Sequence, residues 1–330
     1  MSNLEAKTTE NLPHQYHQDI DDDDDQANSS HKIIPTIHKP TASGEGERDA
    51  QSSKESSKTK INQSNYSDFN VQNLIQNDLK KYVNTLIPKD YPGFVQCHVK
   101  RNQAGITKGF AAIFTLSLDG QDANSQIALL SARKQLTMSG HAEYFIGIDF
   151  ENSSKNLNDE NSLATLKGLN MTGSEYVLYD HQNSSTNDRN KQQSVAIIYD
   201  ERVFGSNQPT KFTVLLGDAE KNIGQIKENE TIIDEWRSGR STSFIQIHNK
   251  TPTYDEKSKT YTLNLYGNRV KLPSHKNFQL ITSIDDHNDN VIMQFGRIDD
   301  SNFALDYRYP LTALQAFAIA LSCFHNRLHS

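Results

Sequence analysis

The chain has 330 residues, which is more than one compact domain usually holds unless part of it is disordered. Its net charge of −7 gives no support to non-specific binding of nucleic acid, so we do not expect nucleic acid as a partner. The two cysteines, Cys97 and Cys323, do not indicate a disulfide framework, and we find no N-terminal apolar segment typical of a signal peptide, so we expect a cytoplasmic chain with free thiols.

Residues 1–65 are expected to form a disordered acidic and polar tail. They contain the acidic run Asp21–Asp25 and the polar run Ser52–Lys60, and their one aromatic residue is Tyr16. Such a segment cannot bury enough apolar area to offset the entropy lost on ordering. Residues 1–92 carry −5 of the net charge and residues 93–330 carry −2, so the folded part could bind an anion only through a local cluster of cations.

Residues 66–92 are predicted to form an amphipathic helix followed by a linker. Apolar side chains recur at spacings of three and four, and Pro88 and Pro92 end the pattern. The apolar positions are Val71, Leu74, Ile75, Leu79, Tyr82, Val83 and Leu86. Two interpretations stay open: the Val71–Leu86 helix packs against the outside of the folded domain, or it docks a partner protein.

Residues 93–330 contain twelve strand-like runs, separated by clusters of Gly, Asn, Asp and Ser that are typical of turns. The runs are Gly93–Val99, Gly109–Leu118, Gln126–Ser131, Glu143–Phe150, Glu175–Asp180, Gln193–Asp200, Lys211–Leu216, Ser243–His248, Thr260–Tyr266, Asn277–Ile284, Asn290–Ile298 and Asn302–Arg308. The pattern is weakest between Glu201 and Arg240, where a short helix near Ile232–Arg237 would fit. So many strands suit a closed sheet, because closure removes the exposed edges.

The end of the chain passes directly from a strand pattern into a helix that is apolar all round. Pro310 suits the first turn of that helix, where its missing N–H costs nothing. A helix with no polar face must be surrounded by protein or by lipid. Gln315 and Ser322 interrupt the apolar run, and polar residues from His325 onward end it too early for a span of roughly 20 apolar residues, so we place this helix inside a closed sheet.

The run Gln294–Phe324, QFGRIDDSNFALDYRYPLTALQAFAIALSCF, resembles the C-terminal signature of the tubby-like protein family. Further matches follow the family's order at Asn249–Pro252, Tyr261–Gly267, Arg269–Val270 and Lys276–Leu280, with weaker ones at Ala128–Lys134 and Tyr179–Asp180. The resemblance covers about residues 93–330. It implies a mainly β domain, a twelve-stranded antiparallel closed barrel around one central hydrophobic C-terminal α-helix.

No pattern in the chain indicates catalysis. It lacks a nucleophile elbow, a phosphate-binding glycine loop, a Cys-x-x-Cys pair and a His-Glu-x-x-His helix. The Asp21–Asp25 run lacks the glycine and the terminal glutamate of a calcium loop. We therefore expect neither an enzyme nor a bound metal or cofactor, and the remaining class of function is binding.

The resemblance implies binding of phosphoinositides, chiefly phosphatidylinositol 4,5-bisphosphate. Convergent cationic donors make charge-assisted hydrogen bonds to phosphate oxygens, and Arg does so in a bidentate fork. The family's Lys-x-Arg pair falls here on Thr165 and Lys167, and its second Arg falls on Lys191. Its Asn falls on Glu143, and a further Lys falls on Glu175. Two of these positions keep a positive charge, and Glu143 would repel a phosphate.

One further basic loop of the family falls on Arg133 and Lys134, which we include among the candidate lipid contacts although the following Gln135–Met138 lacks the family's other basic residues. The pocket is thus depleted, and two hypotheses follow.

The first is a phosphoinositide-dependent membrane-docking adaptor in trafficking or signalling, monomeric, cytoplasmic and peripheral at the inner face of the plasma membrane. The second is a protein-interaction adaptor, for instance in trafficking to a cilium, that has lost lipid binding and recruits partners through its N-terminal region and the Val71–Leu86 helix. Nuclear regulation ranks last, because the Lys54–Lys60 cluster is dilute.

Overall fold

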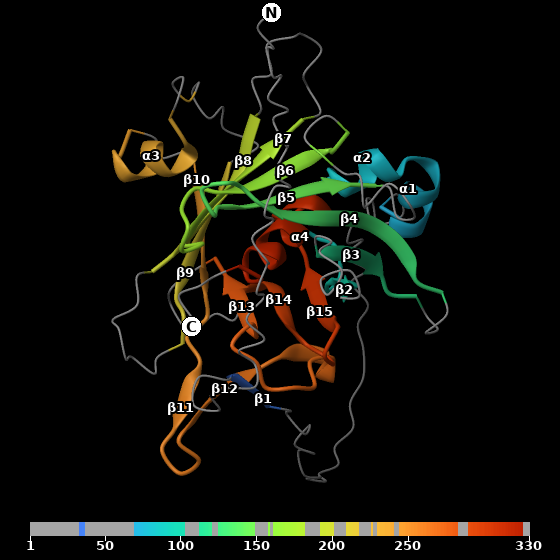
Figure 1. Ribbon diagram of the computed structural model, residues 1–330. Coiled ribbons are helices and arrows are strands. Elements are labelled where there is room, and N and C mark those ends of the chain that lie inside the picture. Colours follow the sequence, from blue (N-terminus) through green and yellow to red (C-terminus); the bar gives the residue numbers. More distant parts are fainter. Residues whose placement is uncertain are drawn as a thin grey trace, which may run out of the picture.

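A closed barrel of twelve antiparallel strands forms the body of the protein (Figure 1). The computed structural model describes residues 33–36, 69–102, 112–120, 125–148, 158, 161–181, 192–200, 209–217, 226, 230–240, 244–282 and 290–325. Around the barrel the strands are β10 (Phe244–Asn249), β13 (Phe278–Ile281), β14 (Val291–Arg297), β15 (Asn302–Tyr307), β2 (Val95–Asn102), β3 (Ile113–Leu118), β4 (Ile127–Leu136), β5 (Ala142–Gly147), β6 (Ala164–Gly168), β7 (Glu175–Asp180), β8 (Gln192–Tyr199) and β9 (Phe212–Gly217). The last of these pairs with β10, which closes the barrel.

The C-terminal helix α4 (Ala313–Ser322) lies inside this barrel (Figure 1). All of its residues are buried except Gln315, which is half-buried because its side chain completes a capping box with Thr312. The predicted mainly β fold, with twelve strands around a hydrophobic C-terminal helix, is confirmed. The expected place of Pro310 in the first helical turn is wrong, because Thr312 is the N-cap and Pro310 precedes it by two residues.

Aromatic side chains fill the barrel beside the end of α4. The Phe295 and Phe303 rings stack at 5.4 Å between centroids, and the Phe324 ring meets Phe303 edge-on at 5.1 Å. The ring centroid of Phe114 on β3 lies 4.7 Å from that of Phe324. These side chains alternate along their strands with outward-facing ones, so the two-residue period of the sequence correctly indicates the inner face.

The number of barrel strands was predicted correctly, but one member was not. The run Thr260–Tyr266, expected in the barrel, instead contains β12 (Thr260–Asn264), which belongs to a separate three-stranded sheet with β11 (Thr253–Asp255) and β1 (Ile33–Thr36). The twelfth barrel strand is instead β6, which lies between β5 and β7. That strand has five residues, four of them buried, so it lacks the polar alternation that identifies a half-exposed strand.

Strand β1 lies within the segment that was expected to be a disordered tail. Residues Ile33–Thr36 pair in parallel with β12, so the expectation is wrong for these four residues. The rest of residues 1–65, including the Asp21–Asp25 run, lies outside the described residues.

The predicted Val71–Leu86 helix is two shorter helices, α1 (Val71–Asn77) and α2 (Leu79–Val83). The break falls at Asp78, whose side chain accepts a hydrogen bond from the Lys81 N–H and caps α2. The apolar face packs on the barrel: Tyr82 is buried, and its hydroxyl lies 3.1 Å from the Tyr307 hydroxyl. The interpretation that this segment packs on the folded domain is confirmed for its apolar face.

The short helix expected near Ile232–Arg237 is present as α3 (Ile232–Arg237), on the outside of the barrel (Figure 1). Ile232 and Ile233 are buried in an outer apolar cluster, whose other buried members are Val177, Ala196, Ile198 and Leu215 of β7, β8 and β9. Across the described parts of the chain, no helix has both the length and the apolar character that crossing a membrane requires.

Candidate functional site

The candidate anion contact Lys167 lies on β6, between β5 and β7. Its backbone is paired with Glu143 on one side and with Val177 on the other. The neighbouring Leu166 is fully buried inside the barrel, so alternation turns Lys167 to the outer face. Lys167 keeps 35% of its side chain exposed and Glu143 keeps 20%.

The ammonium group of Lys167 is paired with a carboxylate. Its Nζ lies 3.4 Å from Glu143 Oε1 and 6.0 Å from the centre of the Tyr179 ring. A partly exposed ion pair of this kind stabilises a fold by about 0–1 kcal/mol, so its structural value is small. The pair matters more for binding, because the negative charge of Glu143 offsets the positive charge that Lys167 would present to a phosphate.

Thr165 lies two residues before Lys167 on the same strand, but it is fully buried. Its Oγ1 is 3.2 Å from Nε2 of His181, whose ring therefore lies against this part of β6. In this structure Thr165 presents no surface to a lipid headgroup.

Glu175 is the first residue of β7 and stands where the family carries a further lysine. It forms an ion pair with Arg237, which the sequence analysis did not single out. Arg237, the last residue of α3, donates a hydrogen bond from Nη2 to Glu175 Oε1 at 2.6 Å. Half of the Arg237 side chain is exposed. The sequence shows that Arg237 lies at the end of a predicted helix, but it does not show that this helix packs where Arg237 can reach Glu175.

Arg133 and Lys134 lie in strand β4, and the prediction that they occupy a loop is wrong. Lys134 points into the barrel, with 2% of the residue exposed, and its Nζ donates to the carbonyl oxygen of Phe324 at 3.4 Å. A cation just beyond the C-terminal end of α4 is favourable, because the helix carboxyl end carries partial negative charge. Lys134 is therefore a structural partner of the central helix.

The outer face of these strands places the remaining candidates in two neighbouring rows. One row runs from Gln135 through Glu143 and Lys167 to Val177, and the other from Arg133 through Phe145 and Thr165 to Tyr179. Arg133 is partly exposed, and its Nη1 donates to Gln135 Oε1 at 3.4 Å. Lys191 lies outside the described residues. The structure thus brings Lys167 next to Glu143, and separates Arg133 from Thr165 by Phe145.

An open groove on another side of the barrel also contains cations, with a volume of about 720 Å³. Its central guanidinium, that of Arg269, forms ion pairs with Asp119 and Asp306 and donates to the Cys97 carbonyl at 2.8 Å. Burial lowers the pKa of Arg269, and the Asp119 carboxylate opposes that shift. Two carboxylates compensate Arg269, and Lys100, Lys271 and Asp299 also line the groove, so charges of both signs are mixed there.

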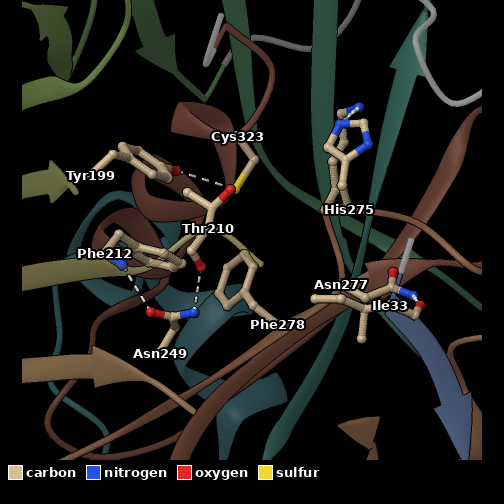
Figure 2. A pocket seen from close by; sticks show the side chains of 10 residues that line it. Ile33, Tyr199, Thr210, Phe212, Asn249, His275, Asn277, Phe278 and Cys323 are labelled. Atoms are coloured by element: carbon tan, nitrogen blue, oxygen red, sulfur yellow. Dashed lines mark hydrogen bonds between the residues drawn. The ribbon is translucent and has the colours of Figure 1, made fainter. Parts of the chain in front are cut away.

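A small cavity near the end of α4 cannot hold a headgroup. Its volume is about 20 Å³, which is enough for about one water molecule. Figure 2 shows Tyr199 and Cys323 on one side of it and Asn277 and Ile33 on the other. Burial raises the pKa of the Cys323 thiol to about 11, so it is a poor nucleophile at neutral pH.

Within the described ranges, no three His, Cys, Asp or Glu side chains gather as metal ligands. Cys97 and Cys323 are both buried and free, as expected. The family resemblance points to the outer face of β5, β6 and β7, which we take as the candidate binding site.

Comparison with known proteins agrees with this architecture. The family model described as Tub family matches residues 83–326. Protein king tubby of Drosophila grimshawi is 32% identical over 239 residues, which cover 71% of this chain and 52% of that protein. Tubby-related protein 3 of Mus musculus is 33% identical over 246 residues, covering 71% of this chain and 52% of that protein. The chain thus spans about half the length of these curated relatives. The match to the family model extends over all twelve barrel strands and the central helix, and the chain belongs to the Tub family.

Proposed function

We propose that this chain is a non-enzymatic tubby-like adaptor that docks on phosphoinositide headgroups at the inner leaflet of the plasma membrane, through a weakened site on the outer face of β5, β6 and β7. The observation that carries the proposal is the 3.4 Å pair between Lys167 and Glu143. In support, Lys167 is a cation on the outer face at a position where the family carries one, and the acid beside it would compete with a phosphate.

The strength of such a site follows from its charges. A headgroup with several phosphates gains from each Lys or Arg by about 1 kcal/mol near an anionic leaflet, which corresponds to roughly fivefold in affinity. Lys167 offers a single ammonium without the bidentate fork of Arg. Since Glu143 repels the same phosphate, we expect weak binding and a headgroup preference that differs from that of a pocket rich in Arg.

The test is co-sedimentation of the full chain with liposomes that contain phosphatidylinositol 4,5-bisphosphate, compared with phosphatidylserine liposomes of equal charge, at physiological salt. Glu143→Gln should raise binding to the phosphoinositide roughly fivefold, and Lys167→Ala should lower it by a similar factor. Lys257→Ala, in the exposed turn between β11 and β12, is the matched control and should leave binding unchanged. Lys191→Ala tests a further candidate cation.

Equal sedimentation with both lipids, for the wild type and for Glu143→Gln alike, would contradict the proposal.

That result would favour the second candidate, a protein-interaction adaptor that has lost lipid binding. Its support is the acidic character of Glu143 and Glu175, which occupy positions where the family carries Asn and Lys. Because the apolar face of α1 and α2 packs on the barrel, partners would bind its exposed polar face or residues 1–65. If residues 1–65 bind the partners, deleting them should abolish localisation, to a cilium for example, whereas the deletion should spare membrane recruitment by the lipid site.

A further inference from the structure

A short segment of the N-terminal region completes a small sheet on the surface of the domain. Strand β1 lies at the edge of this sheet, in parallel register with β12, from Ile33 opposite Tyr261 to Thr36 opposite Asn264. The side chain of Ile33 has 5% of its area exposed. It packs in an apolar cluster with Leu263, Leu265, Val270 and Ala304.

The backbone of Ile33 is also held on the side away from β12. Its N–H donates to the Ser274 carbonyl at 3.2 Å, and the Ser274 N–H donates to the Ile33 carbonyl at 3.3 Å. The same carbonyl accepts from Asn277 Nδ2 at 2.9 Å, as Figure 2 shows. The Ile33 N–H and carbonyl are therefore both bonded on the side away from β12, while Thr36 at the other end of the strand is exposed.

Asn277, which holds the Ile33 carbonyl, is itself fixed by hydrogen bonds within the folded domain. Asn277 donates from Nδ2 to the Leu272 carbonyl at 2.9 Å, and its Oδ1 accepts from the Arg297 N–H at 2.9 Å. Gly296 makes room for the cluster, because a Cβ there would lie 2.6 Å from the Val270 side chain and 2.9 Å from Asn277 Oδ1. The Asn277 amide is thus oriented by bonds that do not involve Ile33.

We propose that the edge of β12, together with Ser274 and Asn277, is a binding slot for an extended peptide, and that the chain's own segment Ile33–Thr36 is its resident ligand. We call it the β12 slot. The recognition is strand addition: main-chain bonds supply affinity for any extended backbone, and the pocket around Ile33 selects an aliphatic side chain. Pro35 is compatible with this role, since proline is tolerated in edge strands.

The contact between Ile33–Thr36 and β12 is short enough for a free peptide to replace this segment. It consists of four residues with one deeply buried side chain, and residues 37–70 connect it to α1. A tethered segment competes with free peptides at an effective concentration on the order of millimolar. A partner peptide with an aliphatic residue in the Ile33 position therefore gains access when the resident segment is weakened, and the slot connects the N-terminal region to the barrel at a second point besides α1 and α2.

The test uses the full chain and a fluorescent peptide with the sequence of residues 29–40. Ile33→Asp in the chain removes the buried side chain and should free the slot, and Thr36→Asp is the matched control at the exposed end of the same strand. We expect the peptide to bind the Ile33→Asp chain at least tenfold more tightly than the wild type or the Thr36→Asp chain. The same peptide carrying Ile33→Asp should not bind any of the three.

A second readout separates an empty slot from an unfolded domain. Amide hydrogen exchange at Tyr261–Asn264 should be slow in the wild type, fast in the Ile33→Asp chain and slow again after the peptide is added, while the barrel melts cooperatively throughout. Absent binding to the cooperatively folded Ile33→Asp chain, or equal binding to all three chains, would overturn the proposal. A wild-type dimer that the peptide dissociates would assign the segment to the slot of a second copy, and would overturn its assignment as the ligand of its own chain.

Discussion

Helix α4 contacts the barrel wall from the inside and helix α3 contacts it from the outside, and different interactions hold the two helices in place. Helix α4 lies inside, and nine of its ten residues are buried. A hydrogen bond of 2.7 Å joins the Ser322 hydroxyl to the Tyr199 hydroxyl on the barrel wall. Helix α3 has six residues and covers the outer apolar cluster with Ile232 and Ile233.

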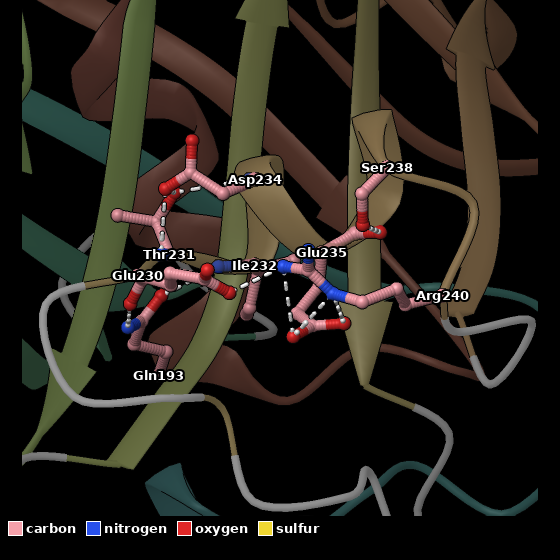
Figure 3. Close-up of polar contacts among 8 residues, drawn as sticks. All are labelled: Gln193, Glu230, Thr231, Ile232, Asp234, Glu235, Ser238 and Arg240. Atoms are coloured by element: carbon pink, nitrogen blue, oxygen red, sulfur yellow. Dashed lines mark hydrogen bonds and ion pairs between the residues drawn. The ribbon is translucent and has the colours of Figure 1, made fainter.

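Polar contacts hold α3 near both of its ends (Figure 3). Gln193 on β8 donates to the Glu230 carbonyl at 3.0 Å and accepts from the Ile232 N–H at 2.8 Å. Arg240 follows the helix and forms ion pairs with Glu230 and Glu235. A helix of this length is not stable alone, so its position depends on specific bonds, whereas α4 depends on packing and on the exclusion of charge.

The largest expected effect is that of a charge inside the barrel. Phe317 is fully buried on α4, so Phe317→Asp would bury an unpaired carboxylate, and we expect unfolding or aggregation. Thermal melting followed by circular dichroism measures it. Met138→Asp is the control, an equally drastic change at a fully exposed site that should melt like the wild type. A soluble, cooperatively melting Phe317→Asp variant would contradict the dependence of the barrel on this helix.

Overpacking α4 should cost less. Ala316 is fully buried, and Ala316→Leu adds three carbons where no space is available, so we expect a loss of about 1–3 kcal/mol in the free energy of unfolding. Denaturant titration measures it. Gln76→Leu, at an exposed position of α1, introduces the same side chain without crowding. An unchanged stability of Ala316→Leu would mean that the barrel interior can expand around the helix.

Alkaline pH should destabilise the contacts of α4. Burial raises the pKa of Cys323 from 9.0 to about 11 and raises that of Tyr199 well above its ordinary value. Because the folded values lie above the unfolded ones, their contribution to stability is complete below about pH 9 and is lost as pH rises through the folded pKa. For Cys323 alone the loss is about 2 kcal/mol at pH 11.

Acidic pH should destabilise the contacts of α3. The hydrogen bond from the Thr231 hydroxyl lowers the pKa of Asp234 below its ordinary 3.8, so this contribution is present above that value and is lost as pH falls through the lower folded pKa. Melting temperatures measured from pH 3 to pH 11, together with the fluorescence of Trp236 on α3, test both halves. A melting temperature that stays level above about pH 9 would contradict the alkaline half.

The smallest expected effect is confined to α3. Gln193→Ala removes both bonds to the start of the helix and should cost about 1 kcal/mol, because one bonded group is the N–H of buried Ile232. Trp236, the single tryptophan, should report this loosening at a denaturant concentration below that of barrel unfolding. Gln192→Ala changes an exposed neighbour and should have no effect. Coincident transitions would show that α3 and the barrel unfold as one unit.

The outer face of β5, β6 and β7 shows which features of the candidate site are visible in the sequence and which are not. The exchange of a family Asn for Glu143 was visible in the sequence, and so was the loss of cations around Lys167. Their direct contact was not, because the two residues lie on different strands and meet only through the register of β5 and β6. The same reason hid the Arg237 contact with Glu175, which forms only after α3 packs on β7.

Lys134 shows how a basic residue can mislead. In the sequence it stands next to Arg133 and suggests an exposed pair, yet consecutive residues of a strand face opposite sides of the sheet. The strand register places Arg133 outside and Lys134 inside, where Phe324 provides a carbonyl partner. Strand β6 was missed for a related reason, since burial on both faces removes the alternation from its sequence.

The sequence by itself determined that the C-terminal helix must be enclosed, because its residues offer no face to water, and that about twelve strands were available to enclose it. Periodicity encodes which side chains are buried, since it follows from local geometry. Only the tertiary structure decided which strands close the barrel, that Ile33–Thr36 joins β12, and that Glu143 neutralises Lys167. These outcomes depend on pairing between segments far apart in the chain, and no local pattern specifies the partner of a strand.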